Sequence, residues 1–359
     1  MFSFNFSPDE GKEDSDIDDV QAKLTLKANA LVDKRIDRSV KSAEKCLLVE
    51  FPPQDLSQDL FYEKLDLHSD NNLAPLCYVI PEHKMANSKR DLIKGVYEGG
   101  LKVWECSVDL CRFLAKIIDE DNPSIDGIDL GSVKDAVMKA VSSGGSTLEL
   151  GCGHGLPSCF ILRENIRLTE PEKSCKNKER NSIVVFIDFN DYVLHHAAIP
   201  NAQINLALSC EEDVQSLWWS RAVFAGGDWM GISREFLNGS KSKVTTKQNS
   251  IGARKDAIPE RYDLILASET TYTQESCEDT AFLMMKHLKI DGGVGLVATK
   301  RFYFGVGGGT DFFSEAAELL GKCNQEPFSG LRLAVRSIRS YDTGNANIRD
   351  LLEVRCHRK

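Results

Sequence analysis

The chain has 359 residues, 42% of them apolar, which is enough for one large domain with a buried core and an extension. A formal charge of −10 argues against a general nucleic-acid-binding protein. No apolar run approaches the ~18 residues of a membrane helix, and the start of the chain lacks the basic and apolar regions of a secretory signal. The eleven cysteines show no CxxC spacing, so we expect reduced thiols in the cytosol or the nucleus.

The first 90 residues differ in composition from the rest. Residues 9–19 carry seven acids and one lysine, so we predict an acidic, disordered tail over 1–45. Residues 46–90 alternate short apolar runs with prolines, and we predict a loosely structured lead-in segment there. The main domain is expected over 91–359, beginning with a helix after Gly99 and Gly100.

Short apolar runs separated by longer segments then predict five strands, at 146–150, 183–187, 221–225, 262–267 and 293–298. Apolar strands separated by crossover segments form a parallel sheet with helices on both faces. Near the chain end, two further runs at 331–341 and 347–357 are joined by a short "DTGNA" turn, which predicts an antiparallel hairpin. We therefore expect an α/β, Rossmann-like fold of five parallel strands plus a C-terminal antiparallel hairpin.

The first of these strands runs into a glycine-rich turn, "LELGCGHGLP" at 148–157. Its three glycines at alternate positions would let a ligand approach the backbone beyond the carboxyl end of the strand. Glu149 precedes them, and its carboxylate can bind an amino group or the amides of the turn, whereas it would repel a pyrophosphate. The turn therefore favours a cationic ligand; a tight strand–helix turn without a ligand is the alternative.

Polar side chains also stand at the ends of the next three strands. Asp188 can bind both hydroxyls of a ribose. In "GGDW", Asp228 and Trp229 can bind the amino group of an adenine and cover its ring, although a capped helix start with a core tryptophan would show the same residues. The polar residues after the fourth strand are Ser268, Glu269 and Tyr272. A nucleoside with a positively charged appendage fits all four strand ends, which indicates S-adenosylmethionine as the cofactor.

Several segments resemble, in the same order, the eukaryotic histidine protein methyltransferases, a seven-strand family that uses S-adenosylmethionine. The matching segments span about residues 88–359 and are "SKRDLIKGVYEGGLKVWECSVDL", "LELGCGHGLP", "DFNDYVL", "GGDW", "LILASETTY" and "KRFYFGVGGGTDFF". The most specific pieces are "YEGGLKVWE" and "YFGVGGG". The resemblance implies transfer of a methyl group to the tele nitrogen of a histidine in the third protein of the large ribosomal subunit.

The resemblance also implies the residues that bind the cofactor. Together with Glu149 of the glycine turn, the expected contacts are Trp104, Glu105, Cys106, Ser107, Gly151, Gly153, Asp188, Asn190, Gly227, Asp228, Trp229 and Ser268. From its place at a strand tip, Glu269 is predicted to accept the second ring N–H of the target histidine, with Tyr272 and Asn190 as walls of the pocket. His154 departs from the family pattern, in which small residues are commoner.

A second glycine run, in "TKRFYFGVGGGTDFF" at 299–313, follows the fifth strand. It is not a P-loop, because the lysine and the serine or threonine that must follow the last glycine are missing. We predict that it binds the substrate: Tyr303 and Phe304 would flank an imidazole, and Gly307 and Gly308 would let the backbone approach a peptide. A tight strand-to-helix turn is the alternative.

A histidine methyltransferase needs no strong base, because an imidazole with a pKa near 6.5 is mostly neutral at about pH 7. The alternatives are a lysine methyltransferase of the same superfamily, suggested by Glu269 and Tyr272, and a ribosomal-protein binding or assembly factor whose catalysis is secondary or lost. No metal site is expected, because His154, His195 and His196 lack clustered ligand partners.

The expected partner is a protein substrate, with no direct nucleic-acid site and no membrane. Residues 233–261 carry seven Lys or Arg against three acids, so this segment is either a solvated insertion or a basic handle for an RNA-rich partner. Reduced cysteines and a ribosomal substrate place the protein in the cytoplasm and the nucleus, with the nucleolus as an open alternative.

Overall fold

The computed structural model describes residues 13–49, 62–68, 73–80, 99–142, 144–169, 182–208, 220–237, 258–344 and 347–359. Its centre is an eight-stranded sheet in the order β1-β8-β7-β6-β9-β10-β12-β11. These strands are β1 (Leu47–Leu48), β6 (Ser146–Leu150), β7 (Ile183–Asp188), β8 (Ala222–Gly226), β9 (Leu264–Ser268), β10 (Val294–Lys300), β11 (Leu331–Tyr341) and β12 (Arg349–Arg358). The five from β8 to β10 pair in parallel, and β11 and β12 form an antiparallel hairpin, which confirms the predicted fold.

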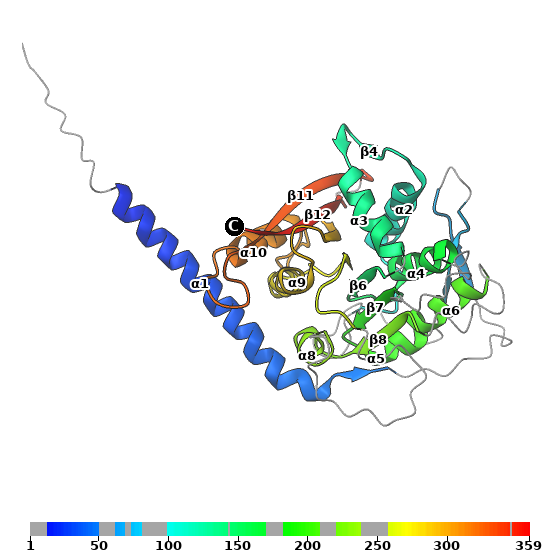
Figure 1. The fold of residues 1–359 in the computed structure, drawn as a ribbon, viewed down its shortest axis with the longest axis horizontal. Coiled ribbons are helices and arrows are strands. Elements are labelled where there is room, and N and C mark those ends of the chain that lie inside the picture. The colour runs from blue at the N-terminus through cyan, green and yellow to red at the C-terminus, as the bar shows by residue number, and fades with distance from the viewer. Residues whose placement is uncertain are drawn as a thin grey trace, which may run out of the picture.

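Helices cover both faces of this sheet (Figure 1). One core involves α2 (Glu105–Asp119), α3 (Gly131–Val141), α4 (Leu156–Thr169) and α6 (Ile199–Ala207), which follows α5 (Asp191–Val193) and a π-helical turn (Leu194–Ala198). The other core involves α1 (Glu13–Ser42), α8 (Trp229–Glu235), α9 (Gln274–His287) and α10 (Thr310–Leu320). In β7, Val184 and Phe186 pack into the first core, while Val185 and Ile187 pack into the second. This alternation buries β7 on both faces and explains its continuously apolar sequence.

Short elements complete the fold. The hairpin of β2 (Tyr62–Leu65) and β3 (Leu76–Val79) lies against α6, where the side-chain oxygen of Asn201 accepts the Val79 N–H at 2.7 Å and that of Asn205 accepts the Cys77 N–H at 2.8 Å. β4 (Ser124–Ile125) and β5 (Ile128–Asp129) form a second small hairpin, and a 3-10 turn (Ala43–Lys45) follows α1. Within the described ranges, the model contains no helix with the length and apolar content of a membrane span.

The disordered tail predicted over 1–45 is wrong for residues 13–45, which form α1 and the turn after it. The prediction rested on the acidic run at the start and overlooked an apolar stripe after it. Ala28, Leu31 and Val32 have helical spacing and are buried against the second core. The start of the predicted lead-in segment forms β1, which pairs antiparallel with β8 and adds an eighth strand. Residues 1–12 and much of 46–90 lie outside the described residues.

Two arginines of α1 attach this helix to the domain. The buried Arg35 lies 2.6 Å from a carboxylate oxygen of Glu278 and 3.1 Å from one of Asp279. Arg38 bonds the second oxygen of Asp279 at 2.6 Å and reaches Asp228, before α8, at 2.6 Å. Burial raises the pKa of Asp279, and the two guanidinium groups oppose this rise. The carboxylate of Asp279 therefore depends on both arginines for its charge compensation.

We expect Arg35→Ala to lower the free energy of unfolding by about 3 kcal/mol, because it leaves part of a buried ion cluster without its counter-charge. Urea unfolding followed by circular dichroism measures this change. Lys34→Ala is the control, since the exposed Lys34 lies 3.8 Å from Glu275 and such pairs contribute ~0–1 kcal/mol. Similar losses in the two variants would show that the buried pairing does not hold α1.

Candidate active site

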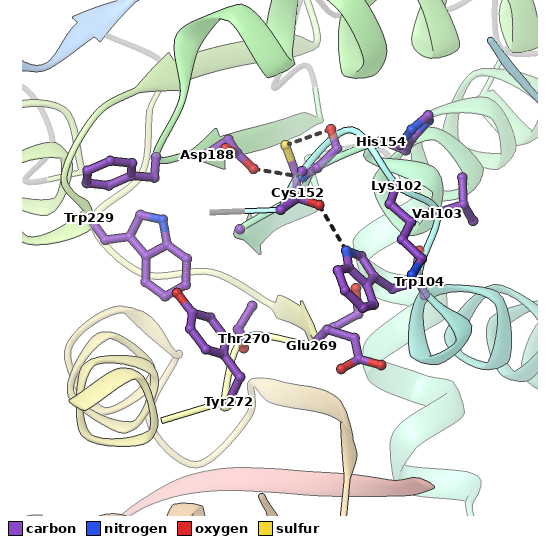
Figure 2. Close-up of a pocket in the computed structure, with 17 residues that line it drawn as sticks. Lys102, Val103, Trp104, Cys152, His154, Asp188, Trp229, Glu269, Thr270 and Tyr272 are labelled. Carbon is purple, nitrogen blue, oxygen red and sulfur yellow. Dashed lines mark hydrogen bonds between the residues drawn. The ribbon is translucent and has the colours of Figure 1, made fainter. Parts of the chain in front are cut away.

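The carboxyl ends of the parallel strands border one cavity, and the rings of Trp104, Trp229 and Tyr272 lie around it (Figure 2). With its open mouth included, the empty space between these side chains is about 570 Å³. The predicted site residues that line it are Trp104, Ser107, Gly151, Gly153, Asp188, Trp229, Ser268, Glu269 and Tyr272. The tips of β6, β7 and β9 and the start of α8 thus meet, as their places at one edge of a parallel sheet require.

Two positions of the turn after β6 favour glycine. Gly151 has a φ of +57°, and a Cβ there would lie 2.8 Å from Cζ2 of Trp229 and 3.1 Å from Cγ2 of Thr270. Gly153 has a φ of +52°, and a Cβ there would lie 3.1 Å from the carbonyl oxygen of Gly100. The missing side chains let the turn pack directly against Trp229 and Gly100.

Asp188 is held at the cavity wall by backbone donors. Its Oδ2 accepts the Gly153 N–H at 2.9 Å, and its Oδ1 accepts the Asn190 N–H at 3.0 Å. The first bond joins the tip of β7 to the glycine turn after β6. The carboxylate therefore has a fixed orientation in the lining, as a residue that binds ribose hydroxyls requires.

Three buried polar atoms of residues that line the cavity have no hydrogen-bond partner among the described residues. They are the donor Nε1 of the Trp229 indole, Nε2 of His154 and the acceptor Oε1 of Glu269. Buried polar atoms are normally paired, so an unpaired donor and an unpaired acceptor in one cavity wall indicate a ligand that satisfies both. Such a ligand carries polar groups at separate points, as a nucleoside with a charged extension does.

Glu269 occupies a strained position at the tip of β9. Its φ of +54° is in the left-handed region, which an ordinary side chain adopts at a cost of ~1–2 kcal/mol. The Tyr303 hydroxyl donates to Oε2 of Glu269, and Nζ of Lys300 lies 4.0 Å from Oε1. Burial, and then this carboxylate, raise the pKa of Tyr303, so the phenol keeps its proton and acts as a donor. Strain of this kind is most often retained where it places a functional group.

Trp104 forms a further part of the cavity wall, and two lysine ammonium groups lie close to its ring. Its indole Nε1 donates to the carbonyl oxygen of Gly99 at 3.0 Å. Nζ of Lys102 lies 4.5 Å from the ring centre and Nζ of Lys300 lies 5.6 Å from it. These contacts fix the ring at the mouth of the cavity.

The residues of the "GGDW" segment have two different roles in the structure, one at the cavity and one at the start of α8. Trp229 lines the cavity, but Asp228 does not; its side chain accepts the backbone N–H groups of Met230 at 3.0 Å and of Gly231 at 3.3 Å and pairs with Arg38. Asp228 thus caps α8 and joins it to α1, as the capped-helix interpretation predicts. Gly227, also predicted to bind the cofactor, lies against Cys46 outside the lining.

Four further predicted cofactor contacts lie outside the lining. Oε2 of the buried Glu149 accepts the Ser158 N–H at 3.0 Å, so this carboxyl group binds the start of α4 beneath the turn. The exposed Glu105 accepts from Asn347 at 2.6 Å. Cys106 is buried behind the wall, where burial and then Glu269 raise the pKa of its thiol. Asn190, predicted as a pocket wall and a cofactor contact, is buried at the start of α5.

The second glycine run forms the loop between β10 and α10. Tyr303 turns toward Glu269, whereas Phe304 is exposed, so the two rings do not flank one space as predicted. A Cβ on Gly308 would lie 2.4 Å from the Thr271 carbonyl oxygen, and α10 begins two residues later. Gly308 therefore serves the tight strand-to-helix turn, while Gly307, with a φ of +71°, is at the loop tip.

Sequence reasoning missed several lining residues: Gly99, Gly100, Lys102, Val103, Cys152, His154, Phe189 and Thr270. The glycine pair before α2 was interpreted only as a helix start, yet it packs on the turn after β6. His154 does not crowd that turn, because Nδ1 of its ring lies 3.2 Å from Nδ2 of Asn201. Burial lowers the pKa of His154, which keeps this imidazole neutral at physiological pH. His195 and His196, by contrast, are exposed.

Comparison with known proteins gives several curated relatives, although no protein-family model matches the chain. The histidine protein methyltransferase 1 homolog of Dictyostelium discoideum is 31% identical over 266 residues, which are 74% of this chain and 60% of that protein. The homolog of Bos taurus is 31% identical over 66% of this chain and 52% of its own length. Histidine protein methyltransferase 1 of Saccharomyces cerevisiae is 26% identical over 79% and 72%, respectively.

The chain thus spans only about half to two thirds of the length of most of these relatives. Among solved structures, an O-methyltransferase from Bacillus cereus in complex with SAH covers 71% of this chain and 91% of its own, at 9% identity. Its TM-score of 0.35 is too low to support a comparison of the two sites.

Burial raises the pKa of Glu149 to about 8, against 4.5 for the free side chain. Between these values the folded state holds a proton that the unfolded state releases, so stability falls with rising pH by up to ~1.4 kcal/mol per unit. We expect Glu149→Gln to remove this slope and to be more stable relative to the original chain at pH 8 than at pH 5. Urea unfolding at both pH values tests this; a difference that does not change with pH would contradict it.

Proposed function

We propose that this chain, a relative of the histidine protein methyltransferases, transfers a methyl group from S-adenosylmethionine to a histidine of a protein. The observation that carries the proposal is the cavity at the strand tips, where a glycine turn, Asp188, Trp229 and Glu269 meet in one wall. The names of the curated relatives support the reaction and the residue that accepts the methyl group.

The cavity fits the cofactor at several points. Gly151 and Gly153 line the cavity, so backbone groups of the glycine turn would lie beside the charged chain of the cofactor. Asp188 is oriented to accept ribose hydroxyls, and the unpaired Nε1 of Trp229 is a donor for a polar atom of the bound nucleoside. When bound, S-adenosylmethionine supplies a methyl group on a positively charged sulfur, which a neutral nitrogen can accept.

Glu269 is the group best placed to orient the substrate. Tyr303 occupies Oε2 of its carboxylate, while the buried Oε1 has no hydrogen-bond partner among the described residues and lies 4.0 Å from Nζ of Lys300. Glu269 itself is one of the residues that line the cavity. An imidazole that donates its second ring N–H to Oε1 would be held in one tautomer, with the other nitrogen unprotonated and directed into the cavity. The same carboxylate would stabilise the positive charge that develops on the ring.

The reaction needs little further chemistry from the protein. Because a free imidazole is mostly neutral at about pH 7, no strong base has to remove a proton first. Holding the acceptor nitrogen in line with the reacting carbon accounts for several kcal/mol of barrier lowering. We further propose a large-subunit ribosomal protein as the substrate and its tele nitrogen as the acceptor, both supported by the motif resemblance alone.

The direct test is transfer of labelled methyl groups to cell extract, followed by acid hydrolysis and amino-acid analysis. We expect label in tele-methylhistidine, in a protein that co-purifies with large ribosomal subunits. Label in methyllysine would favour the lysine methyltransferase alternative. If the protein does not bind S-adenosylmethionine and does not transfer label, the result would favour the alternative of a binding or assembly factor.

Gly151→Ala should weaken S-adenosylmethionine binding by about tenfold or more, because its Cβ meets the Trp229 ring at 2.8 Å and displaces the cavity wall. Isothermal titration calorimetry measures this affinity. Gly127→Ala is the matched control: Gly127 also has a positive φ, of +81°, but a Cβ there meets nothing within 4 Å and the residue is outside the cavity. Unchanged affinity in Gly151→Ala would show that S-adenosylmethionine does not bind next to this turn.

Glu269→Gln should lower kcat by about 10²-fold with little change in cofactor affinity. The amide oxygen would take the Tyr303 hydroxyl, which leaves an N–H₂ donor where the imidazole N–H requires an acceptor. Glu105→Gln, at an exposed carboxylate outside the lining, should keep full activity. Normal turnover in Glu269→Gln would exclude Glu269 as the orienting group.

A further inference from the structure

We propose that residues 302–306, the tip of the loop between β10 and α10, form an apolar docking element for the polypeptide that carries the target histidine. We further propose that Tyr303, within this tip, is a positioning residue that couples docking to Glu269. This inference rests on the proposed function and adds to it how the enzyme recognises its substrate.

The tip exposes large apolar side chains at alternate positions. Phe302 is 50% exposed, Phe304 is 82% exposed and Val306 is 55% exposed. The ring centres of Phe302 and Phe304 lie 6.4 Å apart. Single exposed apolar residues are common on protein surfaces, but a cluster of them on one short loop beside a cavity marks an interaction site. We define these three residues as the apolar tip.

The base of the loop is fixed. The Arg301 guanidinium bonds both oxygens of Asp350, at 3.0 and 2.7 Å, and the Thr310 hydroxyl donates to the same carboxylate at 2.8 Å. The Gly309 N–H donates to the Thr271 carbonyl oxygen at 2.8 Å. The loop is thereby tied both to β12 and to the segment after β9. A preorganised loop loses little conformational entropy when a partner binds to it.

Tyr303 links this tip to the cavity. The residue lies between two of the exposed side chains, yet its ring turns inward and its hydroxyl donates to Glu269, whose side chain is only 7% exposed. The Lys300 N–H lies 3.4 Å from the same hydroxyl oxygen, and the Tyr303 N–H donates to Gly308 at 3.3 Å. One short segment therefore presents apolar side chains outward, while its Tyr303 holds Glu269, the proposed hydrogen-bond acceptor for the substrate imidazole.

The occupant that fits this arrangement is a polypeptide. The apolar tip offers no charged side chain of its own, so it suits apolar residues next to the target histidine. The hydrogen bond between Tyr303 and Glu269 connects the loop that carries the apolar tip to the lining of the cavity. A histidine flanked by apolar residues could thus rest on the tip while its ring reaches Oε1 of Glu269.

The test compares two variants in the labelling assay, with extract from cells that lack the enzyme as the probe, at graded dilutions. The double variant Phe302→Ser with Phe304→Ser should raise the apparent KM for extract protein by about tenfold or more, because two aromatic anchors are removed. Its kcat at saturation and its affinity for S-adenosylmethionine should stay within about twofold of the original values. Leu26→Ser, at a 68% exposed leucine of α1, should change neither parameter.

Tyr303→Phe should behave oppositely, with kcat reduced about tenfold or more and KM little changed, because the ring remains while Glu269 loses its donor. A purely structural role would lower cofactor affinity and both kinetic parameters together, and that result would overturn the inference.

Two other results would also overturn it. Unchanged KM in the double variant, with methylhistidine formed normally by the original chain, would reject the docking role alone and leave the proposed function intact. Absence of methylhistidine with the original chain would reject the proposed function and this inference together. Sedimentation provides a third check, since a dimer that dissociates in the double variant would assign the apolar tip to self-association.

Discussion

Five parallel strands buried on both faces place every polar residue that follows a strand at one edge of the sheet. This constraint organises the rest of the protein, because β6, β7 and β9 contribute residues far apart in the chain to a single cavity. The two helical layers leave this edge uncovered at the strand tips. The polar residues of the site therefore owe their common location to the parallel pairing of these strands.

The cavity wall is set by close packing as much as by polar contacts. Trp229 lies so near Gly151 that no side chain fits between them, and Gly153 is held by Asp188 from the next strand. At Glu269, the fold maintains a left-handed backbone that costs free energy. The carboxylate of Glu269 is thus held both by its strained backbone and by the Tyr303 hydroxyl.

The N-terminal helix α1 binds a residue of the α/β domain that the sequence assigned to the cofactor site. Arg38 of α1 forms an ion pair with the carboxylate of Asp228. Of the "GGDW" segment, Trp229 lines the cavity and Asp228 does not. Arg35 reaches α9 through Glu278 and Asp279. The helix thus supports the wall of the site from outside, by fixing the start of α8.

Apolar runs and their spacing determined the strands, the terminal hairpin and the glycine turn, because these patterns depend on neighbouring residues. Sequence alone also placed Asp188, Ser268 and Glu269 at the correct edge, since strand ends are local features. It could not decide that Asp228 would meet Arg38, 190 positions away, or that Tyr303 would turn inward to Glu269. Each polar side chain had several chemically suitable partners, and only the packing of distant elements selected one.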